Sequence, residues 1–152
     1  MRNMDPAKLE ARYRTLLILW AAQLTSIGFL FLVALFAGAG AQHPPVPDKP
    51  VLSFALAALG TFTAIISFVV RSRLLRESVE KQDPKLVQSA QVVGCTLCEV
   101  PALLGVMAKF TLPGKEFWLL FAISVVTMAL HFPRKTNLLA ASYKDPSFGA
   151  SL

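Results

Sequence analysis

Long apolar stretches constrain the fold of this chain more than any other feature. A transmembrane helix needs about 20 mostly apolar residues to cross the hydrocarbon core of a bilayer. Backbone groups in lipid must find partners within their own segment, so each such stretch is expected to be an α-helix. The four predicted spans are Thr15–Gly38, Val51–Val70, Val87–Phe110 and the slightly shorter Phe117–Phe132.

The composition leaves little chain for a soluble domain. Hydrophobic residues make up 55% of the 152 residues and charged residues only 16%, whereas about a quarter of a typical soluble domain is charged. We therefore predict an all-α fold, a polytopic membrane protein whose four transmembrane helices form two tandem antiparallel hairpins. Residues 1–152 would make a single membrane domain, a four-helix bundle.

The two halves of the chain share an outline. The first and third spans each follow an Asp-Pro pair, Asp5-Pro6 and Asp83-Pro84. This pair is typical of a helix start, with Asp as the N-cap and Pro in the first turn. Each of these two spans also carries a glycine in its second half, Gly28 and Gly105. The repetition indicates a duplicated hairpin.

The positions of Lys and Arg predict the orientation in the membrane. Cytoplasmic loops carry an excess of these residues, and here they gather before the first span, between the second and third, and after the fourth. Both termini and the middle loop are therefore predicted to be cytoplasmic, in a multi-pass protein of the inner membrane. Anionic lipid explains the net charge of +6 better than nucleic acid does. The first span exceeds the ~7–15 residues of a signal-peptide core, so we expect it to be retained despite the small residues Ala39-Gly40-Ala41.

Glu99 is the acidic residue that falls inside a predicted span. A carboxylate at the bilayer centre costs roughly 2.5–3.5 kcal/mol on insertion scales, which makes such a residue a functional candidate. Gln91 lies two turns earlier on the same helix, and Thr61 and Gln23 fall at a similar depth on other spans. One reading is a neutral Glu99 that holds helices together by hydrogen bonds. The other is a proton or cation site, with Glu99, Gln91 and Thr61 as its candidate residues.

Small residues on the third span predict close helix packing. Residues four apart share a helix face, and small side chains let transmembrane backbones approach one another. We therefore expect the second and third helices to pack tightly, with Glu99 at the edge of their contact. The residues concerned are Ala90, Gly94, Cys98 and Ala102 on the third span, and Gly60 and Ala64 on the second.

Cys95 and Cys98 form a CxxC motif inside the third span. In a soluble protein this motif points to redox or metal chemistry. A single pair in mid-membrane is better explained as two small packing residues, so no metal or cofactor is expected. His131, which we place at the inner interface, could reach the depth of Cys95 and is the weak further candidate for a metal site.

The middle loop and the helix after it carry a further pattern. The loop reads Lys81-Gln-Asp-Pro84, and the helix holds a mid-membrane carboxylate followed by a Glu-x-x-Ala-Leu-Leu-Gly segment from Glu99 to Gly105. Together with the preceding apolar helix, this region resembles the hairpin of the rotary ATPase proteolipid, subunit c. In that family the carboxylate is the proton or sodium site of a rotating ring, and the resemblance implies that role for Glu99. The family's run of spaced glycines is reduced here to Gly60.

Motifs of soluble enzymes are missing from the sequence. It contains no Walker-type glycine loop, no HExxH and no GxSxG, so we do not expect an enzyme. The predicted function is structural or accessory, as a subunit of a larger membrane complex whose partners are the lipid bilayer and other membrane subunits or further copies of the chain. The first alternative is proton or cation binding through Glu99, and the second is a metal or redox site at Cys95 and Cys98.

Overall fold

Helices make up all the regular structure of the described residues, which are 6–36, 50–112 and 116–142 of the computed structural model. The predicted all-α class is therefore confirmed over these ranges. The elements are α1 (Pro6–Phe36), α2 (Pro50–Glu80), α3 (Pro84–Thr111), α4 (Glu116–Leu130) and α5 (Lys135–Ala140).

Three of these helices, α1, α2 and α3, are long and apolar enough to cross a membrane. The fourth apolar stretch is also helical, but α4 has only 15 residues, or about 22 Å at 1.5 Å per residue. It is thus shorter than the ~30 Å hydrocarbon core. Helix α2 continues well beyond the predicted end of its span, and its final ten residues carry alternating basic, acidic and apolar side chains.

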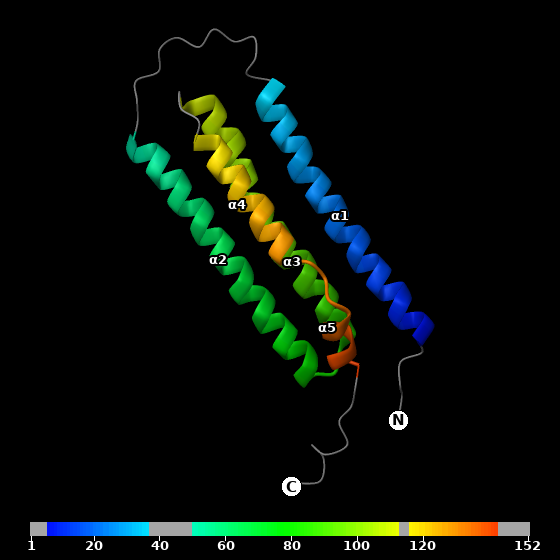
Figure 1. Ribbon diagram of the computed structural model, residues 1–152. Helices are drawn as coiled ribbons and strands as arrows, with labels where there is room; N and C mark the ends of the chain where they lie inside the picture. The colour runs from blue at the N-terminus through cyan, green and yellow to red at the C-terminus, as the bar shows by residue number, and fades with distance from the viewer. Residues whose placement is uncertain (1–5, 37–49, 113–115, 143–152) are drawn as a thin grey trace.

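Helix α3 is the centre of the bundle and contacts α1, α2, α4 and α5. Figure 1 shows α3 and α4 between α1 on one side and α2 on the other. The first two spans therefore do not pack as the predicted hairpin, because the α3–α4 pair lies between them. Burial follows this arrangement, since 50% of the most apolar stretch of α3 is buried but only 11% of that of α1.

The turn between α2 and α3 follows from its sequence. Gln82 takes a left-handed backbone conformation (φ 52°), which reverses the chain. The side chain of Asp83 then accepts a hydrogen bond of 2.9 Å from the backbone N–H of Lys85. Pro84 occupies the first turn, where its missing N–H leaves no hydrogen bond unmade. The predicted Asp-Pro helix start is confirmed here, while Asp5 lies outside the described residues.

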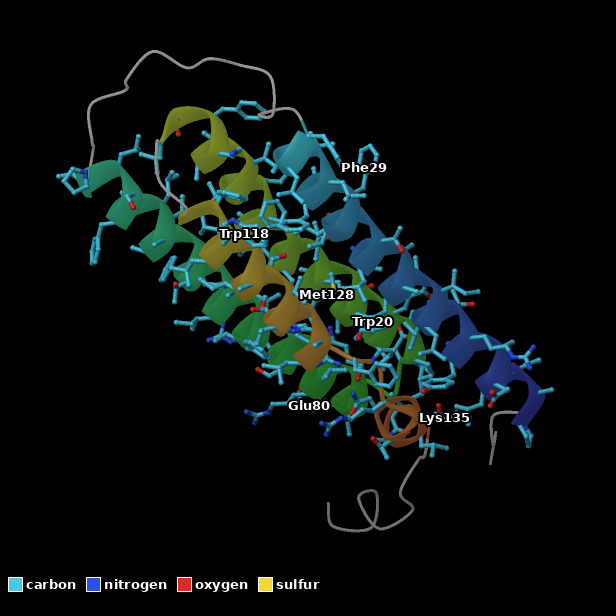
Figure 2. All side chains as sticks on the ribbon, turned by 45° about the horizontal axis from the view of Figure 1, so that its top comes forward. Trp20, Phe29, Glu80, Trp118, Met128 and Lys135 are labelled. Carbon is cyan, nitrogen blue, oxygen red and sulfur yellow. The ribbon has the colours of Figure 1, made fainter. Side chains whose placement is uncertain are left out.

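The interior is tied together by aromatic side chains as well as by small ones. The indole N–H of Trp20 on α1 donates to the carbonyl of Met128 on α4 at 2.9 Å, and Figure 2 shows these two side chains close together.

Phe29, on the outer side of α1, is 66% exposed. Such an exposed apolar face would be costly in water and is suited to a bilayer.

Candidate functional site

The α2–α3 contact brings the predicted small residues together. A Cβ atom on Gly60 would lie 2.7 Å from Leu120 Cδ2 and 3.6 Å from Pro101 Cβ, so the backbone of α2 is very close to its neighbours. Cys98 Sγ on α3 lies 3.7 Å from Ser67 Oγ on α2. Six predicted packing residues are all buried: Ala90, Gly94, Cys98, Ala102, Gly60 and Ala64.

Gln91 is the centre of a buried polar cluster where α2, α3 and the end of α4 meet. Its side chain is 4% exposed, and its Nε2 donates to the carbonyl of His131 at 2.8 Å and to Cys95 Sγ at 3.1 Å. Its Oε1 accepts a hydrogen bond of 3.3 Å from Arg71 Nη2. The same guanidinium nitrogen donates to the carbonyl of Phe132, also at 3.3 Å.

These hydrogen bonds explain how α4 ends inside the bundle. The last carbonyls of a helix have no partner within it, and Pro133 follows α4 too closely for the helix to continue. Gln91 and Arg71 supply donors to two carbonyls just beyond α4, those of His131 and Phe132. An unpaired backbone group in an apolar interior would cost several kcal/mol, so this cluster stabilises the end of α4.

His131 is fully buried within the bundle, whereas we predicted that it faces the inner interface. Its Nδ1 lies 2.8 Å from the carbonyl of Thr127. Because a carbonyl only accepts, the proton is assigned to Nδ1. The ring packs on Phe68 with 4.5 Å between centroids, and no hydrogen bond reaches Nε2 from the described residues. The ring of His131 is thus held inward by Thr127 and Phe68, while its backbone carbonyl is bound by Gln91.

The two thiols belong to the same region. Cys98 Sγ donates to the carbonyl of Gly94 at 3.1 Å and lies 3.6 Å from Nδ1 of His131, while Cys95 accepts from Gln91. The structure thus brings one cysteine and the histidine together. Among the described residues, no group of three or more His, Cys, Asp and Glu side chains could hold a metal ion.

Glu99 lies away from the α2–α3 contact, contrary to the position we predicted for it. It follows Thr96 by one turn, and the hydroxyl of Thr96 accepts a 3.2 Å hydrogen bond from Nε2 of Gln23 on α1. Side chains three apart are neighbours on a helix, so Glu99 is on the α1 side. It is partly buried, and no hydrogen bond or ion pair from the described residues reaches its carboxyl group.

Gln23 completes this second polar site. Its Nε2 is bound to Thr96, whereas its Oε1 is buried and has no partner among the residues that the structure describes. Gln23 Oε1 on α1 therefore has no partner in the described part of the chain, and Glu99 lies one helical turn along α3 from Thr96, the residue to which Gln23 Nε2 donates. Sequence reasoning placed Gln23 at this depth but missed Thr96, which its spacing of three from Glu99 could have revealed.

The other predicted ion-site residues are elsewhere. Thr61 is exposed on α2 and donates to the carbonyl of Ala57 in its own helix at 2.8 Å. Gln91 belongs to the cluster at the end of α4. Arg71, which we predicted only as a charge in the middle loop, belongs to that cluster. It follows Gly60, Ala64 and Ser67 on the inward face of α2, each three or four residues from the next. That spacing is the signal by which its position could have been found.

The apolar helices and the buried polar clusters are those of a helical membrane bundle. Comparisons with protein families, with curated proteins and with solved structures find no match for this chain. The resemblance of residues 54–110 to the rotary ATPase proteolipid therefore stays a prediction.

Proposed function

We propose that this protein is a structural or accessory subunit of an inner-membrane complex, with its termini and its α2–α3 turn in the cytoplasm. The charge distribution supports this orientation. Apart from Lys109 at the C-terminal end of α3, the basic side chains of the described residues lie at the N-terminal end of α1, from the C-terminal end of α2 to the start of α3, and at the start of α5. These are Lys8, Arg12, Arg14, Arg71, Arg73, Arg76, Lys81, Lys85, Arg134 and Lys135.

The observation that carries the subunit role is the outer face of α1. Ala21, Thr25 and Gly28 are exposed there at a spacing of one turn, although lipid tails require no small residues. Small residues at such positions are typical of contacts between membrane helices. A groove of about 300 Å³ between α1 and α4 adjoins Gly28, and a Cβ atom on Gly28 would meet nothing within 4 Å. A helix of another subunit, or of a second copy, would fit against this face.

Replacing Gly28 with leucine is expected to break this association while the single chain stays folded. The Cβ atom of the new side chain meets nothing within 4 Å in its own chain, and a side chain of this size would hold a neighbouring helix away. Native mass spectrometry of protein gently extracted from its membrane would show the loss of the complex, with the single chain remaining.

Ala22→Leu is the matched control, since it adds bulk to another exposed side of α1 and should leave the complex intact. A complex of unchanged mass in Gly28→Leu, or a wild-type protein that is monomeric in its native membrane, would contradict the proposed role.

Proton or cation binding at Glu99 is the second candidate, and the unpartnered oxygens of Glu99 and Gln23 favour it. A protonated carboxyl group has one hydrogen bond to donate, and Gln23 Oε1 is an acceptor without a donor. With the carboxyl ionised, the Glu99 oxygens, Gln23 Oε1 and the Thr96 hydroxyl form an oxygen-rich set of the kind that hard cations prefer. This site would join α1 and α3, unlike the one predicted from Gln91 and Thr61.

A hydrophobic carbodiimide should therefore modify Glu99, and high pH or sodium should slow the reaction because the reagent attacks protonated carboxyl groups. Glu99→Gln should abolish labelling but keep the fold, since an amide packs much as a neutral carboxyl does. Gln23→Leu should weaken protection by sodium, whereas Gln88→Leu, at an exposed position on α3, should not. An absence of labelling at every pH would count against the cation site. So would a rate of labelling that sodium leaves unchanged in both Gln23→Leu and Gln88→Leu.

A further inference from the structure

A groove lies at the cytoplasmic end of the bundle, between the last turns of α2 and the short helix α5. It has a volume of about 400 Å³. Figure 2 shows Glu80 and Lys135, which mark these two helices, at the same end of the molecule. The residues that line the groove are Leu75, Arg76, Val79, Glu80, Asn137 and Ala140.

The groove combines an apolar floor with one cation and one anion. Arg76 and Glu80 are four residues apart on α2, the spacing at which opposite charges on a helix pair with each other. They do not do so, and both side chains are exposed. The ion pairs among the described residues are Lys81–Glu77 and Lys135–Glu10.

The depth of the groove matches the lipid headgroups. Arg76 follows Val70, the last residue of the predicted span, by six residues, or about 9 Å along the helix. The polar layer of a bilayer begins where the ~30 Å hydrocarbon core ends. Leu75 and Val79 extend the apolar surface of the membrane into this layer, so a lipid can place an acyl chain against them while its headgroup stays at the level of Arg76.

We propose that this groove binds a zwitterionic phospholipid with a primary amine, such as phosphatidylethanolamine. Its phosphate would pair with the guanidinium of Arg76, which matches phosphate geometry, and its ammonium group would donate to the carboxylate of Glu80. The amide of Asn137 adds a further polar partner on the α5 side. Phosphatidylcholine has no N–H to offer Glu80, and phosphatidylglycerol has no cation, so the two charges select the amine headgroup.

Native mass spectrometry of the delipidated full chain tests this proposal, with the three phospholipids added singly and with identical acyl chains. One charge-assisted hydrogen bond corresponds to roughly a tenfold preference, so phosphatidylethanolamine should be retained about that much more than phosphatidylcholine. Glu80→Gln should remove the preference, and Arg76→Gln should lower retention of phosphatidylethanolamine and phosphatidylcholine alike.

Arg73→Gln is the matched control, because Arg73 is exposed on the same helix and does not line the groove. It should leave the preference unchanged. Equal retention of phosphatidylethanolamine and phosphatidylcholine would overturn the proposal, as would a preference for phosphatidylglycerol, which would indicate attraction to the basic end of the bundle alone. The same effect from Arg73→Gln as from Arg76→Gln would overturn it too.

Discussion

Replacing Gly60 with leucine should unfold the bundle or leave it severely destabilised. Even the first added carbon would lie 2.7 Å from Leu120 Cδ2, with Pro101 behind it at 3.6 Å. Leu120 is 1% exposed and would have to shift into the groove of about 300 Å³ that it lines, while the backbone of α3 at Pro101 lies 3.8 Å from the new carbon. Overpacking of a dense interior typically costs about 1–3 kcal/mol, and four new carbons at this contact place Gly60→Leu at the upper end of that range or above.

The free energy of unfolding in mixed micelles, followed by the loss of helical circular dichroism as denaturing detergent is added, would measure this effect. Gly28→Leu is the control, since it makes the same chemical change on α1 where nothing lies within 4 Å. Its unfolding free energy should stay within about 0.5 kcal/mol of wild type, as for other surface substitutions. Equal losses in the two variants would show that α2, α3 and α4 are not in close contact at Gly60.

Replacing Gln91 with leucine should lower the free energy of unfolding by about 2 kcal/mol. A buried donor or acceptor that loses its partner costs about 1–3 kcal/mol. This change leaves the carbonyl of His131 without its 2.8 Å donor and removes one acceptor from Arg71. Leucine is similar to glutamine in volume, so the loss would reflect hydrogen bonding at the end of α4 rather than a cavity.

Gln88→Leu makes the same change one turn earlier, at an exposed position of α3, and should be close to neutral. Arg71→Met alone should also destabilise the bundle. Adding it to Gln91→Leu should cost less than the sum of the two single changes, because residues of one hydrogen-bonded network are coupled. Full additivity, or a loss in Gln88→Leu as large as in Gln91→Leu, would contradict the role of this cluster.

Local features of the fold could be read from the sequence because their causes are local. The Asp83-Pro84 helix start depends on one side chain and one fixed backbone angle within a single turn. The helical state of each apolar stretch follows from the need to pair backbone groups away from water. The continuation of α2 beyond Val70 follows from the apolar residues Leu74, Leu75 and Val79, which repeat along that part of the helix.

Positions that depend on neighbouring helices were harder to predict. His131 was expected at the interface, yet it is buried with its ring against Phe68 of α2. Glu99 was expected at the edge of the α2–α3 contact, yet it lies one turn from Thr96, which binds Gln23 of α1. Both differences come from the same source, since sequence spacing shows which residues share a face of a helix but not which helix covers that face.

The sequence by itself determined the helices, their apolar surfaces, the turn at Asp83 and the concentration of basic charge around particular spans, because each depends on contacts within one segment. Only the tertiary structure decided that α3 is the central helix, that α1 and α2 lie on opposite sides of it, and that the polar residues divide into one cluster around Gln91 and a second site at Gln23 and Thr96. The physical reason is that the rotation and order of packed helices are set by the sum of all their contacts. No single stretch of the chain makes all of these contacts.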